Sequence, residues 1–346
     1  MLQPDFEYYG GWYPRYNKEG NEFLRFPLSK NLLRGSIKKI FPNIYHKLYT
    51  NNIIYEIKKN KINVVLAEYG PLGCSIMDAC KKTHTPLIVH FHGFDASEYA
   101  TLKKYKVKYK ELFSIARYIV IVSNIMKEEL KNIETDEDKF FYNPYGVDID
   151  FFEGTNPGDN PPNFISVGRF TPKKSPELTI RAFNEVHKEV KESKLIMVGN
   201  GPLLESCIKL VDELNLKESV IFKGVLNSLE VKNILATSRA FVQHSVRAID
   251  GDMEGTPNTI LEASAMALPI ISTQHSGIIE AVIHNKTGFL VKEHDYNEMA
   301  RYMILLAKDT CRAKEFGINA RQHMIENYSL NYRISRLNEL IHSVVK

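Results

Sequence analysis

From residue 62 onward, short apolar runs rich in β-branched residues alternate with segments of helical periodicity. This alternation is typical of βαβ units and predicts parallel sheets covered by helices. From residue 295 to the end the periodicity is helical only. Strands are expected in two series: residues 62–67, 86–91, 118–122 and 139–142, then 163–167, 194–198, 220–222, 240–243, 269–272 and 288–291.

A stretch rich in proline and glycine, residues 153–162, separates the two series. Such a stretch excludes a helix or a central strand, so we expect a linker there. The chain of 346 residues is also long enough for two domains of roughly 150 residues each. Two α/β domains leave a cleft between them, which is the expected binding site. Residues 1–45 contain no clear opening strand.

Cysteine usage and hydropathy predict a cytoplasmic protein. The four cysteines form no Cys-x-x-Cys pair and have no histidine cluster beside them, which excludes a zinc finger and a disulfide scaffold. No apolar run approaches the roughly 20 residues that span a bilayer. The first residues lack the basic-then-apolar pattern of a signal peptide.

The net charge of +4 lies entirely in the first half of the chain. Residues 30–61 contain eight basic residues and one acidic residue, and residues 99–110 contain five lysines and no acid. The simplest interpretation is a solvated surface. The alternative is a face that contacts anionic lipid, which the interleaved tyrosines and isoleucines favour. Nucleic acid is not expected, because no aromatic and basic binding motif is present.

Two glutamates, Glu254 and Glu262, flank the start of a helix that is expected over residues 257–267. Pro257 suits the first turn of that helix, where its missing N–H is no loss. The amides of Asn258 and Thr259 and the positive helix end then favour an anion. A carboxylate near a bound phosphate is tolerated when vicinal hydroxyls donate to it. The pattern therefore predicts a sugar on Glu254 and a ribose on Glu262, on either side of a diphosphate. An acidic helix start is the simpler alternative.

Two cations, Arg169 and Lys174, follow the first expected strand of the second domain and could both face the cleft. They would neutralise a departing diphosphate, the guanidinium with fork-shaped contacts and the ammonium as a point charge. The simpler interpretation, a basic residue that caps the loop, is reasonable for Lys173 and less so for Arg169. The turn at residues 199–202, Gly-Asn-Gly-Pro, lets the backbone approach a ligand. It is not the Gly-x-Gly-x-x-Gly fingerprint, which argues against NAD.

A His-x-His pattern lies at the end of the expected strand over residues 86–91. Alternation places His90 and His92 on one face, with His92 at the carboxyl end. The pair could bind a metal ion, but no further histidine or carboxylate is expected to complete the set. We expect His90 to be a buried strand residue and His92 to be functional.

As an ordered set, these motifs resemble glycosyltransferase family 4 (glycosyl transferases group 1), the retaining, nucleotide-sugar-dependent enzymes of GT-B type. The resemblance runs from about residue 62 to the C-terminus and includes residues 143–148 and 285–291. Residues 92–95 and 252–257 look most like bacterial exopolysaccharide, capsule or O-antigen enzymes.

The resemblance implies an α/β GT-B fold of two facing Rossmann-like domains. Residues 1–155 would bind the acceptor and residues 156–325 the nucleotide-sugar donor. Residues 326–346 would form a C-terminal helix that packs back on the first domain. Family members usually open with a strand and a glycine-rich loop, for which Gly11 is the local candidate. Gly11 and Asp95 are the expected acceptor-side residues.

The resemblance also implies the roles of single residues. His92, Arg169, Lys174 and Glu254 form the expected catalytic set, with His92 approaching the donor sugar from the first domain and Val225 lying where the family holds the base. The expected donor-binding residues are Gly168, Gly199, Gly201, Val225, Gly255, Pro257, Asn258, Thr259 and Glu262.

The implied reaction moves a hexose-type sugar from a nucleotide-diphosphate sugar, with UDP expected before GDP, to a lipid-linked or polysaccharide acceptor in bacterial surface polysaccharide synthesis. The acceptor hydroxyl attacks from the face of the leaving phosphate and gives its proton to a phosphate oxygen. No metal or other cofactor is expected, and the enzyme would associate peripherally with the anionic inner face of the membrane. The alternatives are a GT-B-fold nucleotide-sugar 2-epimerase and a non-enzymatic basic binding protein.

Overall fold

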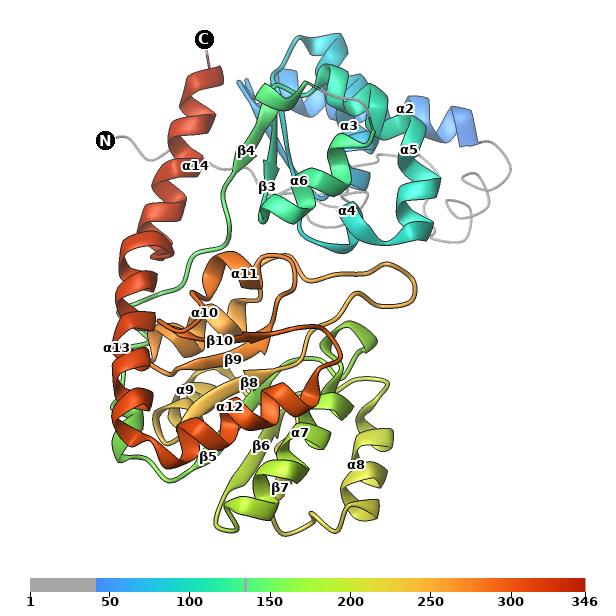
Figure 1. Cartoon of the computed structure of the whole chain (residues 1–346). Coiled ribbons are helices and arrows are strands. Elements are labelled where there is room, and N and C mark those ends of the chain that lie inside the picture. The colour runs from blue at the N-terminus through green and yellow to red at the C-terminus, as the bar shows by residue number, and fades with distance from the viewer. Residues whose placement is uncertain (1–41, 134–135, 346) are drawn as a thin grey trace.

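The computed structural model describes residues 42–133 and 136–345, which form two α/β domains (Figure 1). Within these residues, the sheet of the first domain has four parallel strands in the order β1-β2-β3-β4: β1 (Val65–Glu68), β2 (Leu87–His90), β3 (Tyr118–Ile121) and β4 (Phe140–Tyr142). Its helical segments are α2 (Pro42–Lys59), α3 (Gly70–Thr83), α4 (Phe94–Ser97), α5 (Tyr99–Ile115), α6 (Asn124–Lys131) and the 3-10 turn η1 (Glu137–Lys139).

The sheet of the second domain has six parallel strands in the order β10-β9-β8-β5-β6-β7. The strands are β5 (Asn163–Val167), β6 (Lys194–Val198), β7 (Val220–Phe222), β8 (Ala240–Gln243), β9 (Ile270–Thr273) and β10 (Gly288–Val291). Its helical segments are η2 (Pro157–Asp159), η3 (Pro172–Lys174), α7 (Pro176–Glu189), α8 (Leu204–Glu213), α9 (Ser228–Ala236), α10 (Asn258–Ala265), α11 (Ile278–Ala281), α12 (Tyr296–Lys308) and α13 (Thr310–Asn327).

The expected strands are confirmed, five of them with the expected bounds: β5, β6, β7, β8 and β10. β1 begins later than expected because the N–H of Ile62 still donates to the carbonyl of Ile57 at the end of α2. The expected helix over residues 257–267 is shorter at both ends. Pro257 stands just before it in an extended conformation, with φ −68° and ψ 113°.

The central strands of the second sheet bury both faces, which explains their nearly continuous apolar sequence. On β5, Phe164 packs into the cluster under α7 and α12, whereas the next residue, Ile165, packs into the cluster under α9 and α10. Phe241 and Val242 on β8 divide between the same two clusters. Because all six strands are parallel, their carboxyl ends lie at the same edge of this sheet.

The last helix, α14 (Leu330–Val344), runs alongside the first domain (Figure 1). Its Leu340, Ile341 and Val344 pack on Ile88 and Val120 of the first sheet. The chain that leaves the first domain is bound to the chain that returns. The N–H of Val147 donates to Tyr328 O at 2.8 Å, and the N–H of Leu330 donates to Val147 O at 2.9 Å.

The two domains also touch directly at the carboxyl ends of their strands. The Thr256 hydroxyl donates to Val122 O at 2.5 Å, and the N–H of Met253 donates to the Ser97 hydroxyl at 3.1 Å. The guanidinium of Arg247 forms an ion pair with Glu129 at 2.5 Å. These contacts describe a closed arrangement in which residues of both domains meet at one site.

Some expectations concern residues that the structure does not describe. Gly11, the opening strand and the basic positions 30–41 lie outside residues 42–133 and 136–345. Among the described helices, none combines the length and the apolar character that crossing a membrane requires.

Candidate active site

A buried ion pair forms the centre of the site in the second domain. Glu254 is 7% exposed, and its Oε2 lies 3.1 Å from Lys174 Nζ. Its other oxygen, Oε1, is buried and has no hydrogen-bond partner among the described residues. Burial acts to raise the pKa of Glu254, but the ammonium groups of Lys174 and Lys173 outweigh burial, so the pKa is lowered overall. Glu254 is thus an ionised acceptor with one oxygen still available to a ligand hydroxyl.

Gln243, at the end of β8, connects Lys174 with the start of α10. Its Oε1 accepts from Lys174 Nζ at 3.2 Å and from the Thr259 hydroxyl at 3.5 Å. Its Nε2 donates to the Ser245 hydroxyl at 2.7 Å. The sequence analysis missed Gln243, although a polar residue at the carboxyl end of an expected strand was a usable signal.

Lys173 and Lys174 are adjacent but serve different purposes. Lys173 Nζ donates to Asp252 Oδ1 at 3.1 Å and to Met253 O at 3.2 Å. It therefore fastens the loop before Glu254, as expected for a loop cap, and leaves Lys174 as the cation at the carboxylate.

Arg169 follows β5 with an exposed side chain, for which the described part of the chain provides no hydrogen bond or ion pair. Gly168, Arg169, Lys174 and Gln243 line a pocket at the carboxyl ends of β5, β6 and β8. Even its whole empty volume, about 260 Å³, is below the roughly 300–1,000 Å³ of typical ligand pockets. All residues that line it belong to the second domain, so this pocket alone cannot hold a whole nucleotide sugar.

The glycines after β6 allow two loops to pack backbone against backbone. A Cβ on Gly199, which has φ +132°, would lie 2.0 Å from Gly168 O. A Cβ on Gly201 would lie 2.5 Å from Phe170 O. The sequence predicted that the backbone at Gly199 and Gly201 comes close to a ligand. In the structure this backbone packs instead against the loop that contains Arg169.

Val225 and Glu262 are two further residues of the expected donor-binding set. Val225 is 76% exposed and follows Gly224, whose carbonyl accepts from the N–H of Gly199 at 2.7 Å. Glu262 is partly buried on α10, and burial raises its pKa. Asn258 and Thr259 begin α10, whose N-terminus has no side-chain cap.

The backbone N–H of Glu254 donates to a histidine, His275, that was not predicted from the sequence. The N–H of Glu254 donates to His275 Nε2 at 3.2 Å, and His275 Nδ1 lies 2.6 Å from Glu293 Oε1. Since Nε2 accepts, the ring proton is on Nδ1 and points to Glu293. This chain fixes the backbone on which the carboxylate stands.

On the first domain, His92 has both ring nitrogens engaged. Nε2 lies 2.5 Å from Glu68 Oε2, and Nδ1 lies 2.5 Å from the Tyr145 hydroxyl. Burial acts to raise the pKa of Glu68, but the adjacent imidazoles of His90 and His92 lower it to about 2. His92 is therefore held in one orientation by protein groups on both sides of its ring.

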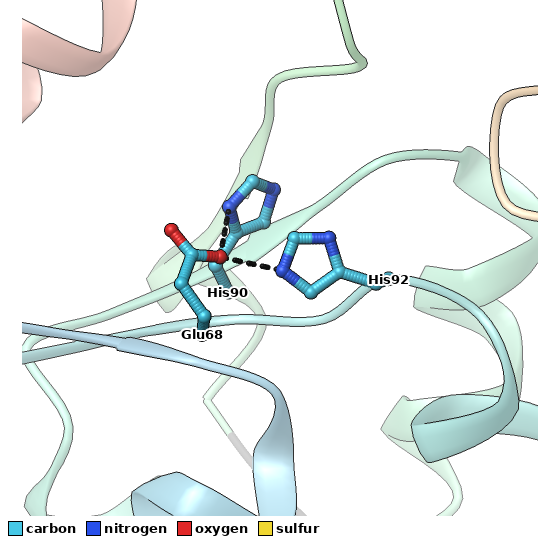
Figure 2. Close-up of side chains that lie close together, drawn as sticks. All are labelled: Glu68, His90 and His92. Carbon is cyan, nitrogen blue, oxygen red and sulfur yellow. Dashed lines mark hydrogen bonds and ion pairs between the residues drawn. The ribbon is translucent and has the colours of Figure 1, made fainter. Parts of the chain in front are cut away.

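Glu68 corrects the expectation that nothing completes the His-x-His pair. Glu68, His90 and His92 bring one ligand atom each within 4.8 Å of one another (Figure 2). Sequence analysis missed Glu68 because the expected strand stopped at residue 67, one residue before it.

Asp95 does not lie where an acceptor would meet it. Its side chain is fully buried, and its carboxylate accepts from the N–H groups of Gly70, His92 and Gly93 at 2.9–3.0 Å. It holds the loop that contains His92 and presents no exposed oxygen to an acceptor.

The loops of the two domains meet at Gly255. A Cβ on Gly255 would lie 2.4 Å from His92 O and 2.7 Å from Val122 Cγ2. The structure thus brings His92, Gly255 and the Lys174–Glu254 pair into one neighbourhood, with contributions from both domains.

Comparison with family models matches both halves of the chain. The model described as "Glycosyl transferases group 1" matches residues 148–323, and "Glycosyltransferase Family 4" matches residues 16–151. The chain is 31% identical over 248 residues to the putative colanic acid biosynthesis glycosyltransferase WcaL of Escherichia coli. That match spans 70% of this chain and 60% of the length of WcaL. The amylovoran biosynthesis glycosyltransferase AmsK of Erwinia amylovora is 26% identical over 92% of this chain and 80% of its own.

Solved structures share the fold. Anabaena HepE in complex with UDP superposes with a TM-score of 0.77 and 17% identity, over 89% of this chain and 84% of HepE. A glycosyltransferase from Rickettsia africae gives 0.73 and 22% identity, over 92% and 89% of the two chains. The expected GT-B fold of two Rossmann-like domains is thereby confirmed.

Proposed function

Since the chain belongs to the glycosyl transferases of group 1, we propose that it transfers a hexose-type sugar, with retention, from a nucleotide-diphosphate sugar to a saccharide acceptor. The observation that supports this most directly is the buried Lys174–Glu254 pair with its unpartnered Oε1. A neutral or apolar ligand would gain nothing from a buried ionised pair. A phosphorylated sugar can use both groups, since its phosphate binds the ammonium and its hydroxyls donate to the carboxylate.

In this proposal, each member of the pair has one task. Lys174, with Arg169, stabilises the charge that develops on the leaving diphosphate. Glu254 accepts hydroxyl groups of the transferred sugar through Oε1, and the amides at the start of α10 face the phosphates. His92 and its loop close the sugar site from the first domain and exclude water.

The proposed chemistry needs no protein base and no metal ion. As the anomeric carbon–oxygen bond to the diphosphate breaks, an oxocarbenium-like centre forms. The acceptor hydroxyl attacks from the same face and passes its proton to a phosphate oxygen. The side chains of Arg169 and Lys174 supply the positive charge that a divalent cation supplies elsewhere.

The relatives guide the choice of substrates. Two of them are named for colanic acid and amylovoran biosynthesis, and HepE was solved with UDP. We therefore propose a UDP-sugar donor before a GDP-sugar, and an acceptor from bacterial surface polysaccharide synthesis, either lipid-linked or polymeric. The exposed Val225 borders the base in this arrangement.

A donor screen followed by product analysis tests the proposal. We expect one nucleotide sugar to raise the melting temperature by mass action. With a saccharide acceptor added, nuclear magnetic resonance should show a new glycosidic bond with the donor's anomeric configuration. An inverted product would contradict retention, and epimerisation of the donor alone would indicate the 2-epimerase instead.

The raised pKa of Glu262 predicts a pH-dependent affinity for UDP. If Glu262 accepts the ribose hydroxyls, protonation removes an acceptor, and protonation begins at a higher pH than for an ordinary glutamate because burial raises the pKa. We expect the affinity of wild type for UDP to fall, as the pH is lowered, by more than protonation of the terminal phosphate of UDP alone causes. Glu262→Gln should weaken binding by about tenfold, corresponding to about 1.4 kcal/mol, and should remove this additional fall.

Isothermal titration calorimetry with UDP makes this measurement. Glu205→Gln, which changes an exposed glutamate on α8 of the same domain, is the matched control and should behave as wild type. An unchanged pH profile in Glu262→Gln would place the ribose elsewhere.

We further propose peripheral attachment to the anionic inner face of the membrane through α5. Its Lys103, Lys104, Lys106, Lys108 and Lys110 are all exposed, as is Val107 at 83%. Basic residues near an anionic surface contribute roughly 1 kcal/mol each. Replacing the five lysines with glutamine should weaken sedimentation with anionic vesicles and leave UDP affinity unchanged.

The control replaces five exposed lysines of the second domain, Lys188, Lys191, Lys194, Lys209 and Lys217, with glutamine. These changes lower the net charge equally and should leave vesicle binding intact. Wild-type binding should also decline as salt screens the attraction. Equal loss in both variants, or equal binding to neutral vesicles, would return the α5 lysines to a solvated surface.

A further inference from the structure

We propose that Glu68, His90 and His92 form a binding site for a divalent transition-metal ion of the zinc class, at the carboxyl edge of the first sheet. The site uses first-domain residues only. It shares His92 with the proposed transfer site, but the proposed transfer itself needs no metal ion.

The three side chains converge because of the strand register. Glu68 ends β1 and pairs directly with His90 at the end of β2, and His92 follows two residues later. Glu68 Oε2 lies 3.2 Å from His90 Nδ1 and 2.5 Å from His92 Nε2. Figure 2 shows that one nitrogen of each ring contacts the same carboxylate oxygen.

His90 provides an independent sign of a missing ligand. It is only 7% exposed, and neither of its ring nitrogens has a hydrogen-bond partner among the described residues. The contact from Nδ1 to Glu68 has the distance but not the alignment of a hydrogen bond. A buried imidazole without a partner is unfavourable, and a metal ion at Nδ1 would satisfy it.

The donor set selects the class of metal. Two imidazole nitrogens and one carboxylate oxygen suit zinc, cobalt or nickel, whereas magnesium and calcium prefer sites made of oxygen. Metal–ligand distances of about 2.0–2.2 Å in a tetrahedron place ligand atoms roughly 3.3 Å apart. The Glu68–His90 separation already fits, and the Glu68–His92 separation must lengthen by somewhat under ~1 Å. The Glu68 side chain is 44% exposed and has room to make this shift.

Tyr145 completes the arrangement from outside the ligand set. Its hydroxyl lies 2.5 Å from His92 Nδ1. When a metal ion binds Nε2, the ring proton stays on Nδ1 and is donated to the Tyr145 oxygen. Metal-bound histidines almost always have such a partner on the second nitrogen, which fixes the tautomer and the ring orientation.

Zinc and cobalt titrations of the tag-free full chain, previously dialysed against a chelator, test the proposal. We expect one equivalent of Zn²⁺ to bind, and Co²⁺ to give the visible absorption of a tetrahedral site. Glu68→Gln should weaken Zn²⁺ binding by at least about tenfold, because it removes a ligand while keeping the side chain's size. Asp78→Asn is the control, since it alters a His46–carboxylate pair of the same domain for which the described residues offer no third ligand.

The outcomes are decisive even if the buried His90 variants fail to fold. Glu68 is partly exposed, so Glu68→Gln is expected to fold, and its melting curve verifies this. No stoichiometric Zn²⁺ binding by the wild type overturns the site, as does Glu68→Gln binding with wild-type affinity. Because neither donor nor acceptor is used, failure here leaves the proposed transfer standing, and failure of the transfer leaves this site standing.

Discussion

Gly255→Ala is expected to reduce turnover by at least about 100-fold while both domains stay folded. The added methyl group would lie 2.4 Å from the carbonyl oxygen of His92 and 2.7 Å from Val122 Cγ2. A backbone carbonyl cannot turn aside as a flexible side chain would, so the two domains must stay farther apart. Misplacement of reacting groups by about 1 Å is enough for a loss of this size.

The effect should separate from folding and from donor binding. Gly255 is not among the residues with positive φ, so alanine introduces no backbone strain. The second domain should keep its affinity for UDP, and the melting temperature should change little. Small-angle scattering in the presence of donor should show a less compact protein than wild type.

Thr256→Val is the matched control at the neighbouring position. It removes the hydrogen bond to Val122 O but adds no bulk at the interface. We expect a loss of about tenfold or less, the cost of one hydrogen bond. If Gly255→Ala keeps turnover within a few-fold of wild type, the closed contact between His92 and Gly255 is not part of the reaction.

The sequence predicts the second domain better than the first for a physical reason. Strands such as β5 and β8 are buried on both faces, so they appear as continuous apolar runs between clear turn residues. Among the described strands β1 lies at the edge of its sheet, and it follows α2 closely, so its start could not be located from hydropathy. The N–H of Ile62 still donates to the carbonyl of Ile57 near the end of α2, so the strand begins only after this residue.

The candidate site was predictable from the sequence at single residues beside strand ends and helix starts, such as Arg169, Lys174 and Glu254, whose roles stay predictions. It was not predictable where side chains meet across the chain. Tyr145 meets His92 from the segment after β4, and His275 supports Glu254 from beyond β9. No local spacing encodes such pairs, because the order and register of the strands within each sheet create them.

Lys174→Met is expected to lose about 10²–10³-fold in kcat and about 3 kcal/mol of unfolding free energy. The kinetic loss follows because one cation no longer stabilises the leaving diphosphate. The stability loss follows because the Glu254 carboxylate, 7% exposed, is left without its 3.1 Å partner. Lys173 stays nearby but is held by Asp252, so it offsets only part of the uncompensated charge.

The double variant Lys174→Met/Glu254→Gln separates these two losses. A neutral amide needs no cation, so most of the unfolding free energy should return in denaturant titrations. Turnover should stay at or below the level of Lys174→Met, since neither the diphosphate contact nor the charged sugar acceptor is restored. Recovery of activity along with stability would mean that Lys174 serves only to neutralise Glu254, and the assignment of Lys174 to the diphosphate would have to be abandoned.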